Sequence, residues 1–170
     1  MIRRVLLLLV SAALCLSLTA CGGGDNAKAS SSGPDIPSYA KQNNERGAHQ
    51  FARYWIETLN AATVSGDTKK LKSLQKKSCT VCTDFARQLD RIYRAGGHVE
   101  SKGFQVKSLI TEAGIPSPGA GVSAMVRTSA ETVYRRKGAK PEKHEPGNLR
   151  LRLIMVRSGD HWLMDRIDPA

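Results

Sequence analysis

The feature that most constrains the fold of this chain is a change of hydrophobic period at Gly96-Gly97. Before these glycines, apolar residues recur with helical spacing, as in Phe51, Trp55 and Leu59. After them, apolar and polar residues alternate, most clearly in residues 149–155. Helices followed by strands predict an α+β fold in which the helices pack on one face of a sheet.

Three helices are expected before Gly97. The first extends from about Gly47 to Ser65, and Gly66 is suited to a left-handed cap after it. Asp67 is the expected N-cap of a second, shorter helix. Its outer face is basic, with Lys69, Lys70, Lys72, Lys76 and Lys77. We interpret this face as solvated, with a surface for cell wall or lipid as the alternative.

The third helix is expected to open at residues 78–82 and to stop at Gly96-Gly97. Its predicted buried stripe consists of Val81, Phe85, Leu89 and Ile92. Because the stripe has helical spacing, this segment should pack on the same core as the first helix.

About four antiparallel strands are expected after Gly97. Residues 99–110 predict one or two strands with a break near Lys102-Gly103, and residues 122–132 predict one long strand. Residues 138–147 are expected to form a loop. Residues 149–155 and 161–167 then form a hairpin through Ser158-Gly159-Asp160. The prediction is a curved antiparallel sheet of about four strands with three helices packed on it.

The N-terminus has the parts of an export signal: Arg3 and Arg4, an apolar run at residues 5–18, and small residues before Cys21. The run of about 14 residues is shorter than the roughly 20 that span a bilayer. One interpretation is an ordinary signal peptide that is cut near Ala20. However, Leu18-Thr19-Ala20-Cys21 resembles the bacterial lipoprotein signal. That resemblance implies that Cys21 receives a diacylglycerol and that the chain is cut before it.

The sequence divides into three parts on this interpretation: a signal peptide at 1–20, a flexible Gly/Ser/Pro tether at 21–45 and an α+β domain at 46–170. Of the 170 residues, removal of the first 20 leaves 150. Loss of Arg3 and Arg4 lowers the net charge from +11 to +9. We therefore expect a protein held by its lipid on the extracytoplasmic face of the cell membrane.

The positive charge favours anionic partners. Nucleic acid is not expected, because the protein is predicted to be exported and its basic residues are spread without an aromatic-interleaved binding motif. The expected partners are the membrane, through the anchor at Cys21, and an envelope protein or an anionic wall polymer.

Cys79 and Cys82 are the cysteines left once Cys15 is removed and Cys21 is lipidated. In an oxidising compartment this pair predicts a local disulfide. A redox-active dithiol at a helix N-terminus is one alternative. A metal site is another, but two thiolates need two further ligands and no second cysteine pair exists. No metal and no cofactor are expected.

The closing strand, residues 159–167, is similar to the ending of proteins with a nuclear transport factor 2-like, or cystatin-like, cone. Together with the Leu18–Cys21 signal, the tether, residues 51–60, Gly66-Asp67, the Cys79/Cys82 pair and Gly96-Gly97, the pattern resembles an uncharacterised actinobacterial lipoprotein family. The resemblance covers residues 47–167 and implies the cone fold, in which a pocket often lies between the first helix and the sheet.

The pocket implied by this resemblance has Tyr54, Trp55 and Trp162 as its candidate residues. The two tryptophans are interpreted first as core anchors, and a ligand platform is the alternative. Titratable candidates show no paired spacing that catalysis would require; they are Tyr54, Asp84, His98, His161 and Asp165.

The predicted function is therefore a binding or scaffolding module of the cell envelope without catalytic activity. This rests on the expected placement and on analogy with the fold. Two alternatives stay open: a small enzyme of the isomerase or hydrolase type that uses the cone pocket, and a thiol-disulfide protein that uses Cys79 and Cys82.

Overall fold

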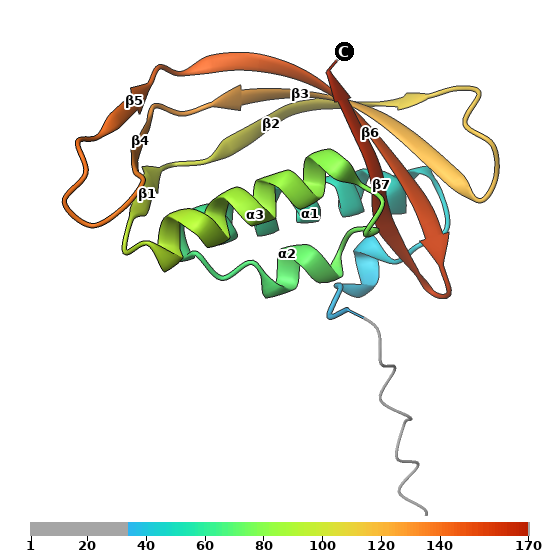
Figure 1. Cartoon of the computed structure of the whole chain (residues 1–170). Coiled ribbons are helices and arrows are strands. Elements are labelled where there is room, and N and C mark those ends of the chain that lie inside the picture. The colour runs from blue at the N-terminus through green and yellow to red at the C-terminus, as the bar shows by residue number, and fades with distance from the viewer. Residues whose placement is uncertain (1–33, 170) are drawn as a thin grey trace, which may run out of the picture. The chain divides into compact units, whose positions relative to one another are not determined.

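The computed structural model describes residues 34–169. The predicted signal peptide, Cys21 and the tether up to residue 33 lie outside the described residues. A short 3-10 helix, η1 (Ser38–Ala40), precedes three α-helices: α1 (Glu45–Ser65), α2 (Lys69–Ser73) and α3 (Thr80–Arg94). The helices lie together under the concave side of antiparallel strands (Figure 1). The α+β prediction is confirmed.

Seven strands follow the helices: β1 (His98–Ser101), β2 (Phe104–Glu112), β3 (Gly119–Thr128), β4 (Glu131–Tyr134), β5 (Glu142–His144), β6 (Gly147–Ser158) and β7 (His161–Pro169). They form two antiparallel sheets with the orders β1-β4-β5 and β2-β3-β6-β7. The number exceeds the four expected, and β5 lies in the stretch predicted as a loop. The additional strands arise because the chain breaks at three points: between β1 and β2, between β3 and β4, and between β5 and β6. At these breaks one sheet bends into the next (Figure 1).

The bend is held by a side chain from α1. The Phe104 amide donates to Asn60 Oδ1 at 2.8 Å, and Asn60 Nδ2 donates to the Phe104 carbonyl at 2.9 Å. Gly103 precedes Phe104 with a φ of +76°, and a Cβ there would lie 2.5 Å from Asn60 Cγ. Ser129 Oγ accepts from the Lys102 amide at 3.0 Å on the neighbouring strand break. The long first helix therefore fixes where the sheet changes direction.

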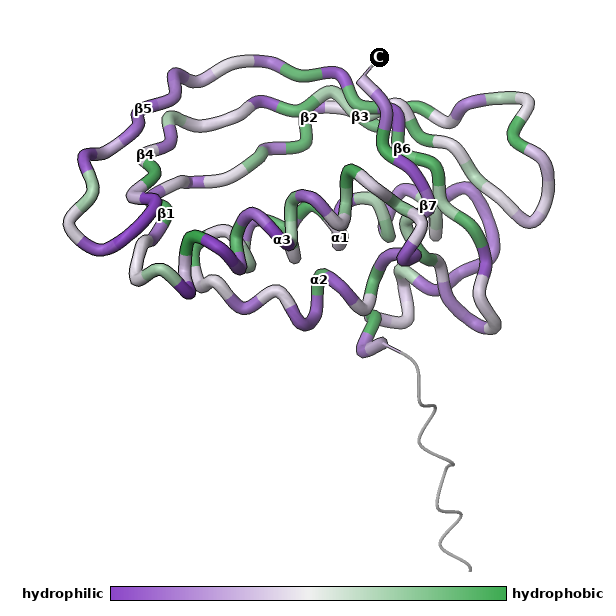
Figure 2. The backbone as a smooth tube through the Cα atoms, in the orientation of Figure 1, coloured by the Kyte–Doolittle hydropathy of each residue, from purple (hydrophilic) through white to green (hydrophobic). Residues whose placement is uncertain are grey.

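Helix α1 is the central element of the core. The Asn44 side chain caps it by accepting from the Gly47 amide at 2.8 Å, and Gly66 ends it with a φ of +75°, as predicted. Its apolar stripe includes Phe51 and Trp55, which are fully buried against side chains of the sheet. The strands alternate between hydrophilic and hydrophobic residues, which lets one face meet this stripe (Figure 2). Each such large side chain contributes about 1.5–3 kcal/mol of burial free energy.

Helix α3 buries a different face from the one predicted. Its buried residues are Cys82, Ala86, Leu89 and Ile92, whereas Val81 and Phe85 are each 38% exposed. The prediction of a buried Val81 and Phe85 is wrong because Cys82, bonded to Cys79, takes the inward position at the start of the helix. Ala86 and the residues one and two turns later then complete the stripe at helical spacing.

The N-cap of helix α2 lies one residue later than predicted. Its N-cap residue is Thr68, which makes no side-chain cap hydrogen bond. Asp67 Oδ1 instead accepts from the Lys69 amide at 3.0 Å. The carboxylate therefore still satisfies one free amide of the first turn, as expected from its residue type.

Residues 34–44 pack on the domain, although we expected them to belong to the tether. Ile36 and Ala40 are buried in the core, and the Tyr54 hydroxyl donates to the Asp35 carbonyl at 2.6 Å. These two apolar side chains and η1 give this stretch a packed face. The folded domain therefore includes residues before the predicted boundary at 46.

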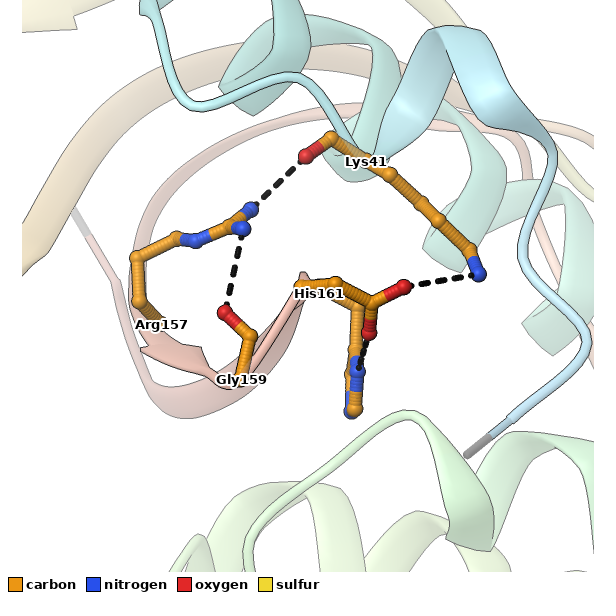
Figure 3. A network of polar contacts seen from close by, with 5 residues as sticks. Lys41, Arg157, Gly159 and His161 are labelled. Carbon is orange, nitrogen blue, oxygen red and sulfur yellow. Dashed lines mark hydrogen bonds and ion pairs between the residues drawn. The ribbon is translucent and has the colours of Figure 1, made fainter. Parts of the chain in front are cut away.

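A polar network joins this N-terminal segment to the β6–β7 hairpin (Figure 3). The Arg157 guanidinium donates to the Lys41 carbonyl at 2.8 Å and to the Gly159 carbonyl at 3.2 Å. Lys41 Nζ pairs with Asp160 Oδ2 at 3.3 Å, and His161 Nδ1 contacts Asp160 Oδ1 at 3.0 Å. The hairpin thus holds the chain just before α1.

The two edges of the four-stranded sheet are protected in different ways. The edge of β7 is covered by the connection between α2 and α3: the Met164 amide donates to the Leu74 carbonyl at 2.9 Å, and the Lys76 amide donates to the Met164 carbonyl at 2.8 Å. Strand β2 forms the other edge and contains a bulge between Val106 and Ser108, at the exposed Lys107.

Candidate binding site

Side chains fill the interior of the predicted cone, which is the space between α1 and the four-stranded sheet. Phe51 and Trp55 of α1 pack in one cluster with Val126 of β3, Met155 of β6 and Met164 of β7, and all five are at most 1% exposed. A hollow of about 120 Å³ lies between the second half of α1, α3 and the three-stranded sheet, and its lining includes Leu59, Leu89 and Val133. Larger hollows lie on the outer surface of the domain.

The three residues predicted to line a pocket do not line a common pocket in the structure. Trp55 is 1% exposed and belongs to the core, and its Nε1 has no hydrogen-bond partner among residues 34–169. Tyr54 is also buried and is held through its hydroxyl by Asp35. Trp162 is buried too, donates from Nε1 to the Gln42 carbonyl at 2.9 Å, and lines a surface cavity beside the start of α1.

A hollow in two parts lies beside the N-terminal half of α1 and reaches β2. One part, of about 570 Å³, is lined by Asn44, Glu45, Arg46, His49, Gln50, Arg53 and Leu109. A second part, of about 290 Å³, shares Asn44 and Glu45 and reaches the β2–β3 loop and Trp162. We call the two parts together the α1 groove. It is the candidate binding site.

A chain of hydrogen bonds crosses the groove. The Thr111 hydroxyl on β2 donates to Glu45 Oε1 at 2.5 Å, and His49 Nε2 lies 2.9 Å from the same hydroxyl oxygen. Because Thr111 gives its single proton to Glu45, His49 must donate through Nε2–H to complete the bond. This chain engages the Glu45 carboxylate, while Arg46 and Arg53 line the same hollow as exposed cations. The groove therefore presents donors and positive charge to a partner.

A second polar cluster lies beside the groove. Ser123 Oγ donates to Glu112 Oε1 at 2.6 Å, and Arg152 Nε contacts Glu112 Oε2. The Ser123 hydroxyl first, and the Arg152 guanidinium with it, hold the pKa of Glu112 below its ordinary value of 4.5, against a smaller opposing effect of burial. The cluster ties β2, β3 and β6 together below the cavity wall formed in part by Glu112.

Glu112→Gln is expected to lower the free energy of unfolding by about 1 kcal/mol near neutral pH. A lowered folded-state pKa means that this contribution is complete above the unfolded-state pKa and is lost as the pH falls through the folded-state value. Urea unfolding of the wild type and the variant should therefore differ at about pH 7, and the difference should shrink as the pH falls below the unfolded-state pKa of about 4.3. Glu145→Gln, at an exposed residue, is the matched control; an equal effect at Glu145 would contradict the role of the cluster.

The predicted disulfide is present between Cys79 and Cys82, and both residues are buried, at 2% and 0% exposure. It closes the turn that leads into α3. Leu74–Lys76, which ends three residues before Cys79, covers the edge of β7. The disulfide therefore stiffens the connection that shields this edge. Burial of both sulfurs shields the bond from an attacking thiolate.

The other titratable candidates lie apart and are engaged separately. Asp84 pairs with Arg87 at 2.6 Å, and Asp165 pairs with Lys76 at 2.9 Å. The His98 ring stacks on Tyr134 with 4.3 Å between ring centroids. His161 contacts Asp160 in the network of Figure 3. Among residues 34–169, no group of three or more metal-ligating side chains is arranged to hold an ion.

The sequence reasoning missed the residues of the α1 groove. Glu45 and His49 are four residues apart, which places them on one face of a helix and is a signal that could have been read. Thr111 could not have been joined to them, because it lies 62 residues from His49 and meets it through tertiary packing.

In the described part of the chain, no helix is both long enough and apolar enough to cross a membrane.

Several solved structures are similar to this chain. The intermembrane space region of the chloroplast protein ARC6 matches with a TM-score of 0.56 at 11% identity, over 75% of this chain and 97% of that one. An uncharacterised protein with a cystatin-like fold from Caulobacter vibrioides matches at 0.45 and 9% identity, over 72% and 89%. An NTF2-like protein with a cystatin-like fold from Novosphingobium aromaticivorans matches at 0.43 and 13%, over 70% and 78%.

The ARC6 region shares the fold of this chain, whose architecture is α+β as predicted. No curated protein matches the sequence. Residues 26–168, by contrast, match a family of unknown function, DUF6318, over most of the chain. The protein with the filled cone and the α1 groove is therefore a member of the DUF6318 family.

Proposed function

We propose that this protein is a lipid-anchored binding module of the cell envelope, attached through Cys21 and facing away from the cytoplasm. The anchor is supported by Leu18-Thr19-Ala20-Cys21 and the basic and apolar stretches before it. Two acyl chains on one cysteine supply the double signal that stable membrane attachment requires.

The observation that carries the binding role is the filled interior of the cone. Phe51 and Trp55 occupy the space between α1 and the sheet where a pocket enzyme of this fold would hold its substrate. Recognition is therefore assigned to the outer surface, and the α1 groove is its most developed feature.

The groove favours an anionic partner. Arg46 and Arg53 are exposed and lie in the lining with His49 and Gln50. Among residues 34–169, neither arginine has a carboxylate within ion-pair distance, so both guanidinium groups are free to bind one. We propose an anionic wall polymer, or an acidic segment of an envelope protein, as the bound partner.

One experiment in intact cells tests both parts of this proposal. A photo-crosslinking residue is placed at Gln50, in the groove, or at Ser108, an exposed residue of β2, as the control. The protein is expected in the membrane fraction, with a crosslinked envelope component from Gln50 alone. Arg46→Glu with Arg53→Glu should remove that product, and Cys21→Ala should release the protein from the membrane.

Two results would count against the proposal in different ways. Membrane retention of Cys21→Ala would refute the anchor. Equal products from Gln50 and Ser108, or products that persist in the Arg46→Glu, Arg53→Glu variant, would refute the groove as the binding surface.

A further inference from the structure

Helix α2 and the start of α3 carry a cluster of cations beside the point where the described chain begins. We define the α2 basic face as Lys69, Lys70, Lys72, Lys76, Lys77 and Arg87. All six residues are exposed. Four have a carboxylate partner: Lys70 with Asp35 at 3.7 Å, Lys72 with Asp90 at 2.6 Å, Lys76 with Asp165 at 2.9 Å and Arg87 with Asp84 at 2.6 Å.

Two lysines of this face have no such partner. Within residues 34–169, no carboxylate lies within 4.0 Å of the ammonium groups of Lys69 and Lys77. The face therefore has a surplus of positive charge that internal ion pairs do not neutralise. Such a surplus attracts an anionic surface.

The N-terminal segment is fixed against the same face. Lys70 pairs with Asp35 and lies over the Tyr54 ring, 5.2 Å from its centroid, while the Tyr54 hydroxyl donates to the Asp35 carbonyl. Residues after position 33 therefore start beside α2, as the blue end of the ribbon shows (Figure 1). A chain anchored at Cys21 would run toward its membrane from this side of the domain.

A cavity of about 270 Å³ opens in the face and is lined by Lys72, Gln75, Lys76, Lys77, Thr83, Ala86 and Arg87. Four of these seven side chains are cationic, so the cavity favours an anionic group. A phosphate supplies the negative charge that Lys77 lacks within the domain.

We propose that the α2 basic face docks on the anionic phospholipid headgroups of the membrane that holds the anchor. This proposal rests on the lipid anchor of the proposed function. Lipid is favoured over free phosphate because the face lies where the chain leaves toward its anchor and because its cations are spread over a surface.

The test uses the intact lipidated protein in vesicles with an acceptor dye on the lipid headgroups. A donor dye at Ser73→Cys reports on α2, and one at Ser108→Cys reports on the opposite, outer face of the sheet. Mixing phosphatidylglycerol into phosphatidylcholine should bring Ser73, and not Ser108, close to the headgroups. Each unpaired lysine should raise the docked-to-undocked ratio about fivefold, so the two together should raise it roughly 25-fold.

The charge-reversal variant Lys69→Glu with Lys77→Glu should abolish this increase. Lys102→Glu with Lys140→Glu makes the same change in net charge at exposed residues elsewhere and should leave docking unchanged. Equal energy transfer from Ser73 in the two lipid mixtures, or equal loss in both variants, would overturn the proposal.

Flotation of the protein with the vesicles reports separately on the anchor, so failure at Cys21 cannot be mistaken for failure of docking.

Discussion

Trp55→Ala is expected to lower the free energy of unfolding by about 3–5 kcal/mol, the usual cost of emptying a buried aromatic site. Trp55 is 1% exposed and packs in the cluster that joins α1 to the sheet. Domains of this size are stabilised by only about 5–15 kcal/mol, so the loss is a large share of the total. Urea unfolding followed by circular dichroism measures it as a lower midpoint at an unchanged slope.

A pair of conservative variants separates packing from hydrogen bonding at the two tryptophans. Trp55→Phe removes an indole nitrogen that has no partner in the described structure, whereas Trp162→Phe removes the donor to the Gln42 carbonyl. Both lose similar volume, so Trp162→Phe should cost about 1 kcal/mol more. Equal costs would show that the Trp162 bond contributes nothing to stability, and a loss below 1 kcal/mol in Trp55→Ala would contradict the assignment of Trp55 to the core.

Asn60→Leu is expected to lower the free energy of unfolding by about 2–3 kcal/mol, because the amide and the carbonyl of Phe104 both lose their side-chain partner. Leucine has the same number of side-chain heavy atoms as asparagine and the same branching at Cγ, so the change tests mainly the hydrogen bonds. The effect should be concentrated at the bend, where hydrogen exchange of the amides in β1 and at the start of β2 should become faster.

Asn60→Asp is the matched control for the bend. A carboxylate can still accept from the Phe104 amide but cannot donate to the Phe104 carbonyl. Its cost should therefore fall between those of wild type and Asn60→Leu. If the two variants unfold alike, or if exchange rises evenly over the whole domain, Asn60 does not hold the bend.

Local patterns made most of the fold predictable. The period change at Gly96-Gly97 separated helices from strands, and Gly66 marked the end of α1. Both features depend on residues a few positions apart. The Cys79–Cys82 bond was predicted because these two cysteines remain as a pair in an expected oxidising compartment. The strand breaks were harder to predict from the sequence, because the Asn60 contact that fixes the bend joins residues 44 positions apart.

The surfaces of the domain were harder to predict than its core. Val81 and Phe85 look as apolar as the residues that are buried, and only the inward position of Cys82 decides which side of α3 faces the sheet. The α1 groove needs Thr111 of β2 beside Glu45 and His49 of α1. No short-range pattern contains that pairing, so the groove could be found only from the packed structure.

The bulge of β2 has a consequence for neighbouring copies of the protein. Molecules confined to one bilayer meet far more often than molecules in free solution, and a bare strand edge invites them to join into continuous ribbons. At this edge a second copy would meet an interrupted hydrogen-bond ladder and the ammonium group of Lys107. Copies held at high density by the proposed lipid anchor should therefore stay unpolymerised, and each should be able to rotate independently of its neighbours.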